Sequence, residues 1–195
     1  MSNGITLTST PKNQITVSRL GSTGPAGPIG MPPVDNCRVG LLDYNDLATA
    51  TTPLNVTGNT GFIDVPNDGA GPFTNKAYTL TDITDLWDAG TGRFDWTELA
   101  LGDHVNIRMD LEVTTTSPNQ VVTAVLELAT GAFSYNILFE EVLYKSAGVH
   151  PLNRTSFVYM GDENTRGNPA RFRISSDDDA TVQVNGWALQ ILKRG

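Results

Sequence analysis

The sequence is poor in cysteine and histidine, with a single cysteine, Cys37, and only two histidines, His104 and His150. A lone cysteine excludes an internal disulfide, and these three residues do not have the spacing of a zinc site. Cys37 opens an apolar run and is predicted to pack as a small buried residue. His104 is predicted to begin a strand and His150 to lie in a loop, both as surface or edge residues. We therefore expect no cofactor and no metal.

Positive charge is also scarce, because Lys and Arg total 13 against 21 Asp and Glu, for a net charge of -8. Such a chain is repelled by phosphate backbones, so nucleic acid is not an expected partner. No segment approaches the ~20 apolar residues of a membrane helix. The first residues have no basic region followed by an apolar core, as a secretory signal would. The expectation is a soluble protein made in a cytoplasm, with no membrane partner.

Motifs for catalysis are missing as well. The sequence contains no nucleophile elbow and no phosphate loop. Glu140 and Glu141 are neighbours on a predicted strand, so they point to opposite faces and cannot share a glycosidase cleft. Residues 177–179 are three aspartates without the ligand pattern of an EF-hand. They are interpreted as a solvated turn, with a cation shared at a trimer axis as the alternative. We do not expect an enzyme, and the catalytic, cofactor and metal sites are predicted to be absent.

What the sequence does have is glycine at every third position over residues 21–32, with prolines in three of the triplets. Only glycine fits at the axis where three polyproline-II chains meet, and proline pre-sets that backbone. The repeat therefore favours three chains side by side, whereas the alternative is a flexible Gly/Pro-rich linker. It is too short to hold a trimer alone. The glycines of the expected trimer stalk are Gly21, Gly24, Gly27 and Gly30.

The residues before the repeat alternate between apolar and polar, with a turn at residues 10–13. This pattern predicts a small β-hairpin. An isolated hairpin is marginal in water, so we expect it to pair with sister hairpins or with a larger partner. The apolar residues of this anchoring arm are Ile5, Leu7, Ile15 and Val17.

After residue 33 the pattern is that of a β protein. Apolar residues alternate from Val105 to Val113, and further strands are predicted near residues 121–128, 133–140 and 172–175. Strands at short intervals, with turn residues between them and no long helix, indicate an all-β sandwich or barrel. Residues 82–88 are the best helix candidate, with a strand or an irregular crossing as the alternative, and residues 78–80 are predicted to be extended.

Two strands carry more detailed predictions. The strand at 121–128 has apolar residues on both faces, which makes Val121 and Val125 candidates for contact with another subunit. In the last strand the apolar residues change parity at Asn185–Gly186, so a glycine bulge there would keep all of them facing inward. Those residues are Val182, Val184, Trp187, Leu189 and Ile191.

The hairpin, the Gly-x-y run and a β domain ending in Gly186-Trp187-Ala188-Leu189-Gln190-Ile191-Leu192 resemble the trimeric fibre and decoration proteins of tailed bacteriophages. Their head domains look like the jelly roll of tumour necrosis factor and of the collagen-stalked complement proteins. This chain departs from the complement proteins in its short collagen-like run and in having no signal peptide. No family motif matches residue by residue, so no binding residues carry over.

The resemblance implies an all-β homotrimer with three regions: an anchoring hairpin or arm (1–20), a collagen-like linker (21–33) and a jelly-roll β-sandwich (34–195). It implies a virion structural protein, a capsid decoration or head fibre held to other virion proteins of the capsid or tail through the N-terminal arm. The alternative is a tail fibre or a tip that binds a receptor or a host surface glycan, through end loops such as residues 162–168. That loop contains no aromatic residue, which disfavours sugar binding.

Overall fold

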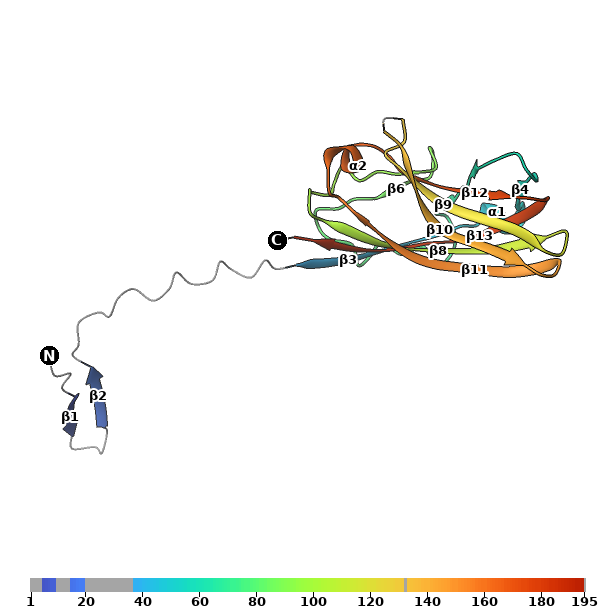
Figure 1. Ribbon diagram of the computed structural model, residues 1–195. Coiled ribbons are helices and arrows are strands. Elements are labelled where there is room, and N and C mark those ends of the chain that lie inside the picture. Colours follow the sequence, from blue (N-terminus) through green and yellow to red (C-terminus); the bar gives the residue numbers. More distant parts are fainter. Residues whose placement is uncertain (1–4, 10–14, 20–36, 132, 195) are drawn as a thin grey trace. The chain divides into compact units, whose positions relative to one another are not determined.

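The computed structural model describes residues 5–9, 15–19, 37–131 and 133–194, and it divides the chain into two compact units, Met1–Asn36 and Cys37–Gly195 (Figure 1). In the first unit, β1 (Ile5–Ser9) pairs antiparallel with β2 (Ile15–Arg19). The register places Leu7 opposite Val17, with Ile5 and Ile15 at positions of the same parity. The four repeat glycines lie outside the described residues.

The second unit contains two antiparallel sheets and two short helices, α1 (Ala48–Thr51) and α2 (Glu163–Gly167). Within the described chain, no helix is long and apolar enough to cross a membrane. The larger sheet consists of β3 (Arg38–Asn45), β4 (Leu54–Val56), β8 (His104–Thr115), β11 (Gly148–Tyr159) and β13 (Ala180–Lys193). The smaller sheet consists of β5 (Ile63–Asp64), β9 (Gln120–Leu128), β10 (Tyr135–Tyr144) and β12 (Arg171–Ser176). A separate strand pair joins β6 (Trp87–Asp88) to β7 (Arg93–Phe94).

The strand order identifies the fold as a jelly roll. The larger sheet runs β11-β8-β13-β3, with β4 also on β13, and the smaller runs β10-β9-β12-β5. Counted along the chain without β4, β6 and β7, the eight strands therefore lie in the orders 1-8-3-6 and 2-7-4-5. This is the double Greek key of a two-sheet jelly roll. The prediction of an all-β jelly-roll sandwich is confirmed.

The core lies between the two sheets and is built on aromatic rings. The alternation predicted from Val105 to Val113 is confirmed, because every second residue of that stretch is buried. Phe172 packs against Trp187 with ring centroids 4.7 Å apart, and Trp87 packs against Phe94 at the same distance. Burying such large rings is the main stabilisation available to a sandwich of this size.

The predicted glycine bulge is present in β13, the central strand of the larger sheet. Its register with β8 shifts between Val184 and Gly186, and the inward side chains on both sides of the shift are buried. Gly186 has φ +147°, and a Cβ at this position would lie 2.3 Å from the carbonyl oxygen of Tyr44. Only glycine therefore fits where β13 crosses the end of β3.

Two segments differ from the helix and the strand that the sequence suggested. Residues 82–86 form a turn and an irregular crossing that leads into β6, as in the alternative to the helix. The amides of Thr84 and Asp85 donate to the Glu98 carboxylate, and the Leu86 amide donates to the Tyr44 hydroxyl. Residues 78–80, predicted to be extended, form a turn beside β3 instead.

The prediction of a buried Cys37 was wrong, and so was the loop predicted at His150, although the prediction of an edge position for His150 is confirmed. Cys37 is exposed, because it precedes the first residue of β3, and β3 lies at the edge of its sheet. His150 lies within strand β11 rather than in a loop, and its ring stacks on Tyr144 of β10 at 4.4 Å. β11 is an edge strand, which is where a sheet tolerates the proline at position 151. His104 begins β8, as predicted.

Three charged side chains link the first strand of the second unit to its last strand. The guanidinium of Arg38 donates two hydrogen bonds to the Asp82 carboxylate, at 3.1 and 2.9 Å, and the Lys193 ammonium lies 3.0 Å from the same carboxylate. Arg38, and after it Lys193, holds the pKa of Asp82 well below its usual range. The first residue of β3 is therefore fixed to the last residue of β13 by a shared counter-ion.

Replacing Gly186 with alanine should lower the free energy of unfolding by roughly 1–3 kcal/mol, because the new Cβ meets backbone and the φ is unsuited to alanine. Gly167→Ala is the matched control, because that position has open space around it and no positive φ. Urea denaturation of both variants measures the difference. Equal stability of the two variants would contradict the account of the bulge.

The depressed pKa of Asp82 predicts an acid-dependent loss of stability. A carboxyl whose folded pKa lies below its unfolded value of about 4 stabilises the fold above that pH, and the stabilisation is lost as the pH falls further. In Asp82→Asn, the free energy of unfolding should fall less steeply below pH 4 than in the parent. Arg38→Met should flatten the same limb, and an unchanged slope in both variants would exclude these charged side chains as its source.

Candidate functional site

We call the solvent-facing side of the larger sheet the outer face. Its composition is unusual for a solvent-facing surface, because large apolar side chains are exposed on it. Register places its residues in rows that cross four strands. One row runs Leu41, Gln190, Asn106, Phe157. The next row towards the start of β3 runs Val39, Leu192, His104, Tyr159, and the next in the other direction runs Asp43, Ala188, Arg108, Thr155.

Both edges of the outer face expose large apolar side chains. We define the β3 flank as Val39, Leu41 and the adjoining Tyr78, and the β11 flank as Phe157 and Tyr159. Tyr78 is 69% exposed and Phe157 is 62% exposed, and the other three are about half exposed. Exposed aromatic and aliphatic groups gathered in this way mark interaction surfaces. Since neighbouring strands lie about 4.8 Å apart, the two flanks are separated by roughly 14 Å of sheet.

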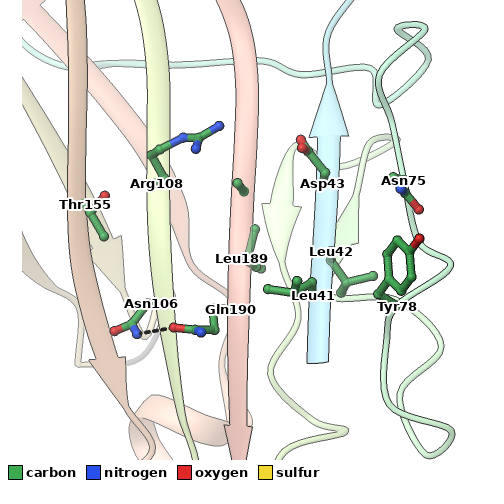
Figure 2. Close-up of a pocket in the computed structure, with 11 residues that line it drawn as sticks. Leu41, Leu42, Asp43, Asn75, Tyr78, Asn106, Arg108, Thr155, Leu189 and Gln190 are labelled. Carbon is green, nitrogen blue, oxygen red and sulfur yellow. Dashed lines mark hydrogen bonds between the residues drawn. The ribbon is translucent and has the colours of Figure 1, made fainter. Parts of the chain in front are cut away.

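A groove of about 480 Å³ crosses the outer face beside the β3 flank (Figure 2). Leu41 and Tyr78 form one wall, and the Tyr78 carbonyl accepts a hydrogen bond from the Leu41 amide at 3.0 Å. The floor is polar, because the Asn106 side-chain amide donates to the Gln190 side-chain oxygen at 2.9 Å. The groove is therefore an apolar wall beside a polar floor whose amides already bond to each other.

Two side chains of opposite charge, Asp43 and Arg108, also line the groove. Burial raises the pKa of the Asp43 carboxyl, and the positive charge of Arg108 partly offsets this effect. Arg108 Nε donates to Asp110 at 2.7 Å, in an ion pair along β8. The floor thus combines both signs of charge, which suits a polar protein surface better than a strongly charged ligand.

The opposite side of the sandwich is different, because charged side chains cover it. Arg171 and Arg173 of β12 pair with Glu127 of β9 at 2.8 and 3.3 Å, and Arg171 also pairs with Asp64 at 2.7 Å. Burial raises the pKa of Glu127, but hydrogen bonding and charge from Arg171 and the charge of Arg173 lower it overall. Beneath this network Val125 is only 4% exposed. The prediction that Val125 serves as a contact with another subunit was therefore wrong.

The acidic groups considered in the sequence are occupied within the fold. Asp177 accepts from the Val121 amide at 2.8 Å, Asp178 from the Ser117 hydroxyl at 2.6 Å, and Asp179 from the Gly58 amide at 2.9 Å. Glu140 pairs with Arg154 of β11. Among the described residues, no group of three or more His, Cys, Asp or Glu side chains could hold a metal ion. These aspartates fix the turn between β12 and β13.

The predicted end loop at residues 162–168 contains α2, whose N-cap is Asp162, accepting from the Thr165 amide at 2.7 Å. Two aromatic residues outside the loop lie beside it. The Tyr135 hydroxyl lies 2.9 Å from the Thr165 hydroxyl, and both residues line a hollow of about 420 Å³ together with Tyr159. Tyr159 ends β11 three residues before Asp162, so the sequence could have indicated it, whereas Tyr135 comes from β10 in the other sheet and has no local signal. Tyr159 shares a row with Val39, so α2 lies at the end of the unit where the chain enters β3.

Comparisons with known proteins found only low similarity. No protein-family model matches the sequence, and no curated relative does. A chain of the infectious bursal disease virus Gx strain structure superposes with a TM-score of 0.42 at 12% identity, covering 94% of this chain and 40% of that chain. This chain thus spans less than half of the bursal disease virus chains that it matches.

Two further solved structures are similar over most of both chains. Eiger TNF from S. frugiperda has a TM-score of 0.40 and 10% identity, covering 80% of this chain and 92% of that chain. PRD1 vertex protein P5 has a TM-score of 0.36 and 13% identity, covering 100% and 83%. Identities this low concern the fold alone, and the assignment of the jelly roll rests on the strand order described above.

Proposed function

We propose that this chain is a structural protein of a tailed-bacteriophage virion, a homotrimeric capsid decoration or head fibre anchored to the particle by its N-terminal arm. The observation that carries the proposal is the pairing of a Gly-x-y repeat with a jelly roll whose outer face keeps two apolar flanks exposed. The repeat favours three adjacent chains, and the flanks supply the apolar area through which three jelly rolls associate.

Each region has a separate task in this proposal. The hairpin of β1 and β2 contacts another virion protein, since two five-residue strands are marginal in water without a partner. The jelly roll forms the trimer, and the repeat aligns the three arms. Three linked arms bind as one unit, which raises the avidity by ~100-fold or more over one arm.

The position of α2 bears on the alternative role as a receptor-binding tip. Residues 162–168 lie at the end of the jelly roll where the chain enters β3, whereas the turns that follow β8 and β10 lie at the other end. A tip that projects away from an anchored N-terminus would use those turns. The structural role is therefore the better supported of the two.

Deleting residues 1–20 should leave a trimer that no longer joins the particle, because the deletion removes the anchoring arm and leaves the jelly roll intact. Native mass spectrometry measures the oligomer, and gel analysis of purified particles measures incorporation, which should fall by ~100-fold or more. Full-length protein added to the same particles is the control. Normal incorporation of the truncated chain would refute the anchoring role, and a monomeric full-length chain would refute the trimer.

A further inference from the structure

We infer that the β3 flank of one jelly roll receives the β11 flank of a second copy, and that three such contacts close a ring in which each outer face is turned towards the three-fold axis. The inference rests on the proposed function, since it specifies how the proposed trimer is held together. It names a partner for each flank: the occupant of the groove at Leu41 and Tyr78 is Phe157 of a neighbouring copy.

A three-fold ring needs two different patches on each subunit. In a cyclic trimer the contacts are heterologous, so patch A of one copy meets patch B of the next. The outer face has two such patches, and they differ in shape. The β3 flank forms the wall of a groove, whereas Phe157 and Tyr159 stand on the edge strand β11. Among the described residues, neither side chain stacks on another ring or takes part in a side-chain hydrogen bond.

The ring can close only if both patches lie at the same height along the axis. A heterologous contact between patches at different heights adds a translation at each step and generates an open filament. Register fixes the heights here: Leu41 shares a row with Phe157, and Val39 shares a row with Tyr159. A rotation about an axis parallel to the strands therefore brings one flank to the other with no translation.

Such a ring would leave the central strands of the outer face at the axis. Apart from Ala188 and Leu192, their side chains in the three rows are polar, and Asn106 already bonds to Gln190. Arg108 is likewise paired with Asp110. These groups can face a hydrated axis at little cost, while the apolar flanks on either side of them are removed from water.

The chain enters the jelly roll at the β3 flank. Arg38 begins β3 and Val39 is the next residue, so the β3 flank follows the Gly-x-y repeat closely in the sequence. Three chains that are adjacent along the repeat would enter three jelly rolls beside the flanks that are to meet. Both flanks also lie in the rows nearest to that entry point.

Disulfide cross-linking tests the ring directly. In a full-length Cys37→Ser background, the double variant Leu41→Cys/Phe157→Cys should give covalent trimers on mild oxidation, with no larger species. The double variant Val39→Cys/Tyr159→Cys, in the next row, should do the same. The matched control is Leu41→Cys/Val149→Cys. Val149 is exposed on the same strand and face as Phe157 but lies several rows away from it. That control should stay at least tenfold less cross-linked.

Other results would overturn the inference. Covalent dimers from Leu41→Cys alone would indicate a two-fold contact of identical patches, and a ladder beyond three would indicate an open assembly. A native mass of three chains without cross-linking of either row pair would refute this interface and leave the proposed trimer standing, whereas a monomeric parent would refute both.

A charge substitution provides a second measurement that does not depend on oxidation. Leu41→Glu should weaken the trimer at least tenfold in sedimentation experiments, because a carboxylate would be buried against Phe157 of the neighbour. Leu143→Glu is the control, since Leu143 is exposed to a similar extent on β10 of the other sheet. Equal effects of the two substitutions, or no effect of Leu41→Glu in a folded protein, would contradict the assignment.

Discussion

The fold depends on one irregularity in its central strand, the bulge at Gly186. β13 pairs with β8 on one side and with β3 and β4 on the other, so every strand of the larger sheet except β11 contacts it. Without the bulge, its inward residues on one side of Gly186 would turn to solvent, because a shift of one residue exchanges the two faces of a strand. Trp187, which packs against both Trp87 and Phe172, would leave the core.

The same bulge determines what the outer face presents. By restoring the parity beyond Gly186, it places Ala188, Gln190 and Leu192 on the solvent side, in register with β3 and β8. The two sides of the sandwich then diverge in chemistry. The smaller sheet carries a network of paired arginines and carboxylates, with Leu143 exposed on its edge strand β10. The larger sheet has a mainly polar centre, with the hydrogen bond between Asn106 and Gln190, between apolar edges. A surface of the second kind gains free energy from a partner, and the first kind gains little.

Local patterns were enough to predict several of the strands but not which strands are neighbours. Alternation revealed β8, and the change of parity at Asn185–Gly186 revealed the bulge, since both are properties of one strand. The flanks were missed because Leu41 and Phe157 are brought into one row only by pairings between distant strands. The irregular crossing at residues 82–86 and the exposure of Cys37 likewise depend on parts of the chain that are distant in sequence. Glu98 and Tyr44 satisfy the amides of the first, and the edge position of β3 exposes the second.

The separate roles proposed for the repeat and the jelly roll follow from how much each can stabilise a trimer. A few Gly-x-y triplets cannot hold three chains together, since the collagen helix gains stability only from many stacked turns. Two apolar flanks per jelly roll, each bearing at least one exposed aromatic ring, provide a larger area to bury. The association is therefore expected to begin in the jelly rolls, and the repeat then needs only to transmit a three-fold symmetry that already exists.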